Sequence, residues 1–539
     1  MTKTTLRIAM AQLNLHIGNI TENLAKHIQA ANEARDLHQA DLVVFPELSL
    51  TGYSPEDLLN RKHFIEASDA ALKTLTETVH GIYCLVGHPQ QIKNKLYNAT
   101  SLIYNGKILG QYHKQCLPNN SVFDERRYFT PGDKPLIQTI KGIPIGILIC
   151  EDIWHIQPAQ QALDAGARLI VNLNASPFEL DKHEQRLTVL RKRAIHHHTP
   201  IVYVNNVGGQ DELIFDGGSM IINNEGNVAT LAPFFKESLT VTSLEFNENS
   251  VNIPETTYTL PATLERAYQG LVLAIRDYIN KNHMPHVLVG VSGGIDSALT
   301  LTLAVDALGK DRVHAVVLPS RHSSKLSLEE ANALTQNLGV KTKTIDIEPT
   351  YQAVVSSLKN EICTQGSSVT LQNCQARARG ILLMALSNES GGLVLTTGNR
   401  SELAVGYCTL YGDMAGGFAP LKDVPKTMVY ALAHYRNQLG EVIPPRTITR
   451  APTAELAPDQ KDQDSLPPYE LLDAILLAHL NQGMGVAEMV AAGLPEADVV
   501  KVVRLVKLSE YKRKQAAMGP RLNAYAFGKD WRFPVTNGF

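Results

Sequence analysis

The stretch His286–Ser297, HVLVGVSGGIDS, decides how the second half of this chain folds. Its apolar part, Val287–Val291, is rich in β-branched residues and predicts a strand buried on both faces. The strand ends at Ser292-Gly293-Gly294, and a helical pattern follows over Asp296–Leu308. A glycine pair between a strand and a helix N-terminus lets backbone N–H groups close on an anion, which the helix dipole also favours.

Three side chains strengthen this anion site. Ser292 and Ser297 add hydroxyl donors, and Asp296 can hold a metal bound to the same anion. The loop lacks the Gly-Lys-Ser/Thr ending of a Walker-type loop. SGG alone fits an ordinary glycine-rich turn, whereas the full S-G-G-x-D-S after an apolar strand is far more specific. It resembles the pyrophosphate loop of the ATP pyrophosphatase family, whose members cleave ATP between its α and β phosphates and adenylate a substrate.

Strands and helices alternate along the rest of the second half. This order predicts a doubly wound, Rossmann-like parallel sheet with ligands at the C-terminal ends of its strands. The predicted strands after the first are Val313–Leu318, Thr344–Ile347 and Leu393–Thr396, and the predicted helices include Ala298–Leu308 and Leu328–Leu338, with two more before about Asn388.

Polar residues that follow these strands extend the resemblance. Thr396-Thr397-Gly398-Asn399-Arg400-Ser401-Glu402 leaves the last strand, and PLKDVPKTMVY and YKRKQAAMGPRL come later. In order, they resemble the NAD synthetase family across about the whole second half. The resemblance implies Mg²⁺ bound by Asp296 and Glu402; ATP bound by Ser292, Gly293, Gly294, Ile295, Asp296, Ser297, Thr397 and Lys426; and deamido-NAD bound by Asn373, Arg377, Tyr407, Asp413 and Lys512.

The first half contains more strands than helices. This composition predicts two mixed sheets packed face to face with helices outside. Asn105-Gly106 between two apolar runs is a hairpin signal. The predicted strands are Leu6–Leu13, Leu42–Phe45, Tyr83–Val86, Leu96–Ile103, Lys107–Tyr112, Ile145–Ile149, Leu169–Leu173, Ile201–Asn205 and Gly218–Ile222, with a helix over Asn19–Gln39.

Glu47, Lys114 and Cys150 each stand at the end of one of these strands. A thiol needs a base to become a thiolate, and a carboxylate can supply it. An ammonium can stabilise the oxyanion formed when an amide carbonyl is attacked. Taken singly, the three also fit a strand cap, a surface charge and a small buried thiol.

The sequence around these three residues removes that ambiguity. FPELSLTGY, HKQxLP and ILICEDIW resemble, in order, the three signatures of the nitrilase (carbon–nitrogen hydrolase) superfamily. The resemblance spans roughly Leu6–Ala232 and implies an αββα sandwich with a catalytic triad of Glu47, Lys114 and Cys150. It also implies a glutamine-binding set of Tyr53, Asn120, Glu125, Ser176 and Lys182.

Asn120 departs from the family pattern. After the lysine, such enzymes read L-P-x-Y-G-V-F-D-E, whereas this chain has Asn120 at the position of the aromatic. A buried aromatic contributes roughly 1–3 kcal/mol through area and stacking. Either glutamine binding is weaker here, or Tyr53 or Phe129 fills the gap.

Length and composition bound the organisation of the chain. At roughly 150 residues per domain, 539 residues predict two large domains. The periodicity fades between Phe235 and Pro261, so the predicted domains are 1–245 and 263–539, joined by a linker over 246–262. The 50 basic and 53 acidic residues nearly balance, which argues against a nucleic-acid surface.

No apolar run reaches the roughly 18–20 residues needed to span a bilayer. The six cysteines (84, 116, 150, 363, 374 and 408) form no CxxC pair, which fits a reducing compartment. We therefore expect a cytoplasmic protein with no membrane partner.

Together the two resemblances imply an enzyme that hydrolyses glutamine and passes the ammonia to deamido-NAD through an adenylate, converting ATP to AMP and pyrophosphate. They also imply a homo-oligomer paired through the synthetase domains. Two alternatives stay open: an amidotransferase of the same ATP family that acts on another carboxylate, and a non-enzymatic nucleotide-binding module with an inactive hydrolase half.

Overall fold

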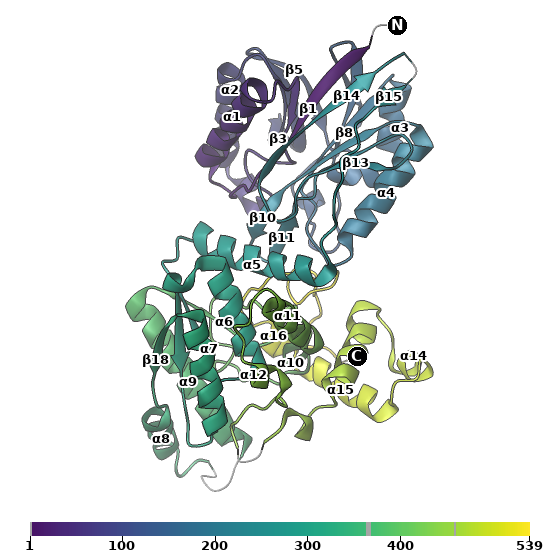
Figure 1. Cartoon of the computed structure of the whole chain (residues 1–539). Helices are drawn as coiled ribbons and strands as arrows, with labels where there is room; N and C mark the ends of the chain where they lie inside the picture. Colours follow the sequence, from purple (N-terminus) through teal and green to yellow (C-terminus); the bar gives the residue numbers. More distant parts are fainter. Residues whose placement is uncertain (1–2, 249, 363–367, 458–459, 539) are drawn as a thin grey trace. The chain divides into compact units, whose positions relative to one another are not determined.

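The computed structural model describes residues 3–248, 250–362, 368–457 and 460–538 (Figure 1). The chain forms two compact units: Met1–Gln210 with Ile214–Pro261, and Asp211–Leu213 with Ala262–Phe539. Part of the predicted linker is not a free connection, because β15 (Val251–Asn252) pairs with β14 (Ser238–Phe246). The exact domain boundary stays a prediction.

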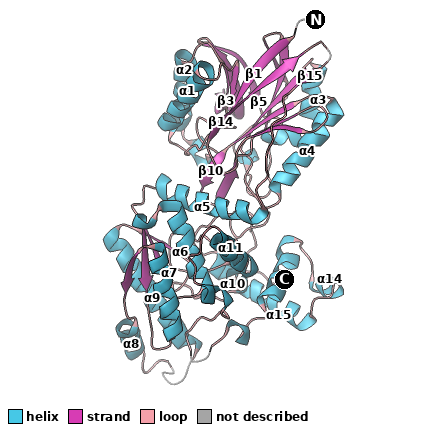
Figure 2. Ribbon diagram, in the orientation of Figure 1, coloured by secondary structure: helices cyan, strands magenta, loops and turns pink. Residues whose placement is uncertain are grey.

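The first unit contains two sheets with helices on their outer faces (Figure 2). One sheet has the order β15-β14-β1-β2-β3-β4-β5 and the other β13-β12-β9-β8-β7-β6; β10 and β11 form a separate pair. The strands are β1 Thr4–Gln12, β2 Leu42–Val44, β3 Tyr83–Ile92, β4 Lys95–Tyr104, β5 Lys107–His113, β6 Leu136–Ile140, β7 Ile143–Ile149, β8 Leu169–Asn174, β9 Ile201–Asn205, β10 Val207–Gln210, β11 Leu213–Asp216, β12 Met220–Ile222 and β13 Val228–Leu231; the helices are α1 Ile20–Asp36, α2 Lys62–Thr78, α3 Ile156–Asp164 and α4 Lys182–His197.

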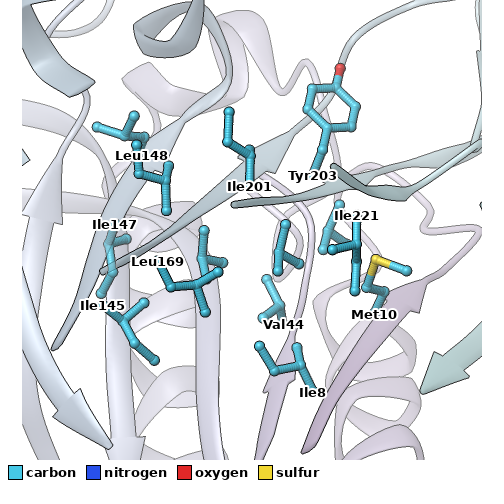
Figure 3. Packing of buried hydrophobic residues seen from close by; sticks show 14 of the residues in the cluster. Ile8, Met10, Val44, Ile145, Ile147, Leu148, Leu169, Ile201, Tyr203 and Ile221 are labelled. Atoms are coloured by element: carbon cyan, nitrogen blue, oxygen red, sulfur yellow. The ribbon is translucent and has the colours of Figure 1, made fainter. Parts of the chain in front are cut away.

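Alternation along the strands separates two apolar layers. Ile8 and Met10 of β1 pack in the core between the two sheets, whereas Ala9 and Ala11 pack with α1 and α2. Figure 3 shows the inner layer, where Ile8, Met10 and Val44 of one sheet face residues of the other, among them Ile147. Because the two sheets pack face to face and helices pack on their outer faces, the prediction of an αββα sandwich is confirmed.

The second unit is built on a parallel sheet of order β18-β17-β16-β19. Because β16 lies between β17 and β19, the strand order reverses there, and such a switch point opens a crevice at the C-terminal strand ends. The prediction of a doubly wound parallel sheet is confirmed. The strands are β16 Val287–Gly290, β17 Val313–Val317, β18 Lys341–Thr344 and β19 Leu393–Leu395; the helices are α5 Thr263–Lys281, α6 Ile295–Leu308, α7 Lys325–Leu338, α8 Glu348–Ser357, α9 Val369–Ser390, α10 Arg400–Val405, α11 Lys426–Gln438, α12 Pro445–Thr449, α13 Tyr469–Leu476, α14 Val486–Ala491, α15 Glu496–Leu508 and α16 Glu510–Arg513.

Two local predictions were wrong, and one helix was missed. The strand expected at Thr344–Ile347 is Lys341–Thr344, an exposed edge strand of lysine and threonine that has no apolar pattern to mark it. The sequence predicts fading periodicity and no strand between Phe235 and Pro261, but Ser238–Phe246 pairs with β1 along its whole length. Serine, threonine and glutamate separate its apolar residues, so no apolar run marks the strand. Helix α2 was not predicted.

In the described part of the chain, no helix is long and apolar enough to cross a membrane. Five cysteines there are free thiols, at positions 84, 116, 150, 374 and 408. The sixth, Cys363, lies outside the described residues.

The core between the sheets generates a stability prediction. Ile147 is 1 % exposed at the centre of β7. Ile147→Ala is expected to destabilise the first unit by about 2–5 kcal/mol, because the deletion removes buried area and leaves a cavity. Urea unfolding followed by circular dichroism measures this. Ile156→Ala is the matched control, because Ile156 is 55 % exposed; equal shifts for the two variants would contradict the assigned core.

Two candidate active sites

Glu47, Lys114 and Cys150 come together at the ends of three strands of the first unit. Glu47 lies in the turn after β2, Lys114 directly follows β5, and Cys150 directly follows β7. All three are buried. Cys150 has a positive φ of 45°, a conformation that is uncommon for a non-glycine residue.

Lys114 joins two carboxylates. Its Nζ donates to Glu47 Oε1 at 2.7 Å and to Glu125 Oε1 at 2.8 Å. Burial alone would lower the pKa of the Lys114 ammonium, but Glu125 and Glu47 outweigh it and hold that pKa well above its usual value. The site therefore contains a permanent positive charge.

Neutral donors fix Glu47 further. The Nδ2 of buried Asn98 donates to Glu47 Oε1 at 2.7 Å, and the Ala175 N–H donates to Oε2 at 3.0 Å. Sequence reasoning missed Asn98, since nothing local marks a polar residue in the middle of β4 as part of a site. With both oxygens occupied, Glu47 has one orientation.

Glu125 is the second carboxylate of the cluster, and Tyr53 is its partner. The Tyr53 hydroxyl donates to Glu125 Oε1 at 2.8 Å. Burial raises the pKa of Glu125, Lys114 opposes this rise, and the negative charge of Glu47 adds to it. The structure thus brings these two predicted glutamine-binding residues into the same network as the triad.

The Cys150 thiol is a weak acid in this setting. Burial and then nearby Glu47 raise its pKa well above the usual value, while Lys114 acts in the opposite direction. The resting sulfur is therefore a thiol, and a base must accept its proton before it can act as a nucleophile.

The other predicted glutamine-binding residues lie in different settings. The Oγ of buried Ser176 accepts from Arg186 Nε at 3.0 Å. Lys182, at the start of α4, lies 3.8 Å from Glu179 and 5.1 Å from the Trp154 ring centroid. Asn120 is exposed. Its role, like the effect of the missing aromatic, stays a prediction.

The second candidate site is a cavity of about 560 Å³ in the second unit. The loop after β16 and the start of α6 form one wall, as the sequence predicts. Other predicted residues also line the cavity: Thr397 and Glu402, Lys426, and Asn373, Tyr407, Asp413 and Lys512. A cavity of this size fits a nucleotide.

Lys426 joins two carboxylates at this cavity as well. Its Nζ donates to Asp296 Oδ2 at 2.5 Å and to Glu402 Oε1 at 3.1 Å. Asn399 Nδ2 donates to Asp296 Oδ1 at 2.9 Å. Burial raises the pKa of Glu402 to about 8; Lys426 opposes the rise and Asp296 adds to it. Glu402 also caps α10 with Asn399, so it serves both fold and site.

Four residues predicted to bind deamido-NAD shape the cavity wall. Thr409 connects two of them: its hydroxyl donates to Asn373 Oδ1 at 2.7 Å, and its N–H donates to Asp413 Oδ1 at 2.6 Å. The Tyr407 hydroxyl donates to Asp462 Oδ1 at 3.1 Å. Lys512 Nζ donates to two backbone carbonyls at 2.7 Å.

Arg377 does not line the cavity, and Arg379 does. Arg377 is exposed and donates to the Leu410 carbonyl at 3.2 Å. Arg379 is half-buried, and burial lowers the pKa of its guanidinium to about 10. A helix turns about 100° per residue, so two arginines two positions apart point in different directions. The other residues of α9 that line the cavity recur at helical spacing, and Arg379 lies on the same helix face. This periodicity could have identified Arg379 from the sequence.

Comparisons with known proteins place both sites in a family. A carbon–nitrogen hydrolase model matches residues 7–249, and an NAD synthase model matches residues 267–516. The chain is 46% identical to the glutamine-dependent NAD(+) synthetase of Acinetobacter baylyi and 42% identical to that of Aquifex aeolicus, over 99% of this chain and 99% and 100% of those proteins. The chain belongs to the glutamine-dependent NAD(+) synthetase family.

A solved structure of this family agrees over the full length. The glutamine-dependent NAD(+) synthetase of Acinetobacter baumannii, in complex with ADP, is 44% identical, covers 99% of both chains and has a TM-score of 0.80. A family member from Cytophaga hutchinsonii, 22% identical with 99% and 98% coverage, shares the fold with a TM-score of 0.84. The hydrolase match contains Glu47, Lys114 and Cys150, and the synthase match contains Asp296, Glu402 and Lys426.

Close approach of two backbone segments generates a prediction for the first site. A Cβ at Gly87 of β3 would lie 2.5 Å from both Pro46 O and Leu48 N, the atoms that flank Glu47. Gly87→Ala is expected to displace Glu47 and to lower the rate of glutamate release from glutamine about 100-fold, since a misplacement of about 1 Å has that effect. Ammonium-dependent activity should not change, and a wild-type rate with glutamine would refute this dependence.

Proposed function

We propose that this chain makes NAD from deamido-NAD, with a glutamine-hydrolysing site at Cys150 and an ATP-dependent amidating site at the Ser292–Ser297 loop. The observation that carries the proposal is the coexistence of two complete polar clusters, one in each matched region. An inactive hydrolase half would not need to bury Lys114 between Glu47 and Glu125 beside a thiol.

At the first site, Cys150 Sγ attacks the carboxamide carbon of glutamine while Glu47 accepts the thiol proton. Lys114 stabilises the oxyanion of the tetrahedral intermediate. The C–N bond then breaks, and the nitrogen takes the proton from Glu47 and leaves as ammonia. Water, activated by Glu47, hydrolyses the thioester to glutamate. The high pKa of the Cys150 thiol explains why a fixed base is needed.

At the second site, the nicotinate carboxylate of deamido-NAD attacks the α-phosphate of ATP. The bond to the β-phosphate breaks, and the loop N–H groups, Ser292, Ser297 and Lys426 stabilise the charge of the departing pyrophosphate. Ammonia then attacks the acyl adenylate, loses a proton, and displaces AMP to leave the carboxamide. This order of bond changes accounts for AMP and pyrophosphate as products.

The residues of the second site fit Mg²⁺. Asp296 and Glu402 are oxygen donors at the mouth of the phosphate loop, and Mg²⁺ prefers one or two carboxylates together with substrate phosphates. Among the described residues no cluster of three or more His, Cys, Asp or Glu exists that would hold a metal alone, so the phosphates would supply the remaining ligands. When bound, the metal would neutralise phosphate charge.

Two further properties belong to the proposal. Ammonia is largely protonated at neutral pH and then not nucleophilic, so a sheltered route between the reactions is expected. Family membership also favours a homo-oligomer paired through its synthetase regions. The partners are small molecules, and nothing in the charge balance favours nucleic acid.

Cys150→Ala tests whether the two reactions are separable. Because Cys150 acts only on the amide, the variant should lose glutamine-dependent NAD formation and keep the ammonium-dependent rate at alkaline pH. Measuring NAD with each nitrogen source decides this. An equal loss of NAD formation with both nitrogen sources would contradict the assignment of two sites.

Asp296→Asn tests the second site. The variant removes a carboxylate assigned to the metal, so NAD formation should fall about 10²–10³-fold with either nitrogen source, the typical effect of losing one stabiliser of developing charge. Glutamate release at the first site should persist. Product analysis of the wild type should give AMP and pyrophosphate; ADP and phosphate would overturn attack at the α-phosphate.

A further inference from the structure

Asp152 is a fully buried carboxylate two residues after Cys150. It accepts four hydrogen bonds. Its Oδ1 accepts from the backbone N–H groups of Gln115 at 3.0 Å and Cys116 at 2.8 Å. Its Oδ2 accepts from the Ile149 N–H at 3.0 Å and from the Tyr112 hydroxyl at 2.8 Å. The mechanism above does not use this group.

The four donors belong to the two segments that carry the catalytic cation and the nucleophile. Gln115 and Cys116 directly follow Lys114, whereas Ile149 directly precedes Cys150. These segments are far apart in sequence. Oδ1 holds the segment after Lys114, whereas Oδ2 holds Ile149 and, through the Tyr112 hydroxyl, the end of β5 before Lys114. A shift of either segment would therefore break hydrogen bonds to Asp152.

The negative charge of Asp152 suits a group that must accept four hydrogen bonds. Burial raises the pKa of Asp152 to about 6, and the N–H groups of Cys116 and Ile149 oppose the rise. The group is therefore mostly ionised at neutral pH, and an ionised carboxylate has acceptor sites for all four donors. Hydrogen bonds to a charged acceptor are stronger than those between neutral groups.

We propose that Asp152 is a positioning residue of the glutaminase site, whose carboxylate holds the segment after Lys114 and the end of β7 before Cys150 in one reactive geometry. It acts through these two residues and does not itself contact the reacting atoms. The inference rests on the proposed roles of Lys114 and Cys150.

Asp152→Asn is the decisive variant because it keeps the shape and changes the acceptors. An amide has one oxygen and one NH₂ group. Whichever way it turns, the NH₂ faces either the N–H pair of Gln115 and Cys116 or the N–H of Ile149. One of the two segments must therefore lose its anchor, while the packed volume stays the same.

The experiment uses the full-length enzyme with ATP, Mg²⁺ and deamido-NAD, with glutamine or ammonium as nitrogen source. In Asp152→Asn, kcat for glutamine should fall about 100-fold, the effect of a misplacement of about 1 Å. The KM for glutamine should stay within about threefold, because the groups that bind the ground state are untouched. Ammonium-dependent kcat should stay within about twofold.

Glu151→Gln is the matched control. Glu151 also follows Cys150 directly, but its side chain is 29% exposed and faces the exposed His155 at 3.2 Å. This variant should keep wild-type kinetics with both nitrogen sources. Tyr112→Phe is the milder test, since it removes one donor and keeps the carboxylate; kcat for glutamine should fall several-fold at unchanged KM.

Three results would overturn the inference. The first is a wild-type kcat for glutamine in Asp152→Asn, or in Tyr112→Phe where Asp152→Asn gives no folded enzyme. The second is an equal fall with glutamine and ammonium together with a lower Tm, which indicates a role in folding only. The third is a raised KM at unchanged kcat. Failure of the proposed function is distinct, because it would show as glutamine-dependent activity in Cys150→Ala.

Discussion

Lys114 carries a positive charge into a space that water does not reach, between the carboxylates of Glu47 and Glu125. Removing one member of such a buried group typically costs about 3–5 kcal/mol, because a charge is left unpaired. The three residues come from three separate loops at the ends of β2 and β5 and in the turn that begins at Glu125. The network therefore fixes the loops to one another, and the sandwich beneath serves to bring those strand ends together.

In the second unit, backbone conformation rather than charge positions the loop after β16. At Gly293 φ is +82°, and a Cβ there would lie 2.2 Å from the Ser327 carbonyl oxygen. Only glycine allows the loop after β16 to pass so close to α7 where the loop lines the cavity. The switch point of the sheet places this loop at the crevice, so a short stretch of sequence is enough to locate the site.

Features with local causes could be predicted from the sequence, and features caused by distant partners could not. The strand at Val287–Gly290 and the glycine turn after it depend on residues next to each other. By contrast, β14 becomes a strand through its pairing with β1, and Asn98 becomes a site residue through Glu47. The positions of Arg377 and Arg379 depend on how α9 is rotated against the cavity. That rotation is set by packing and not by any single residue.

Both sites place one ammonium between two carboxylates, yet their surroundings give this pattern different consequences. In the first site, neutral hydrogen-bond donors stabilise the surplus negative charge of the carboxylates. These donors are Tyr53, Asn98 and the Ala175 N–H. That arrangement suits a neutral substrate such as a carboxamide, because binding changes no charge. In the second site, burial raises the pKa of Glu402 to about 8, and Lys426 opposes this rise. A divalent cation that arrives with a polyanionic nucleotide would favour the ionised form of Glu402, since carboxylate ligands must be ionised to bind metal. The shared charge pattern therefore keeps its ionisation state in the first unit when substrate binds, whereas in the second unit the ionisation of Glu402 depends on the bound ligands.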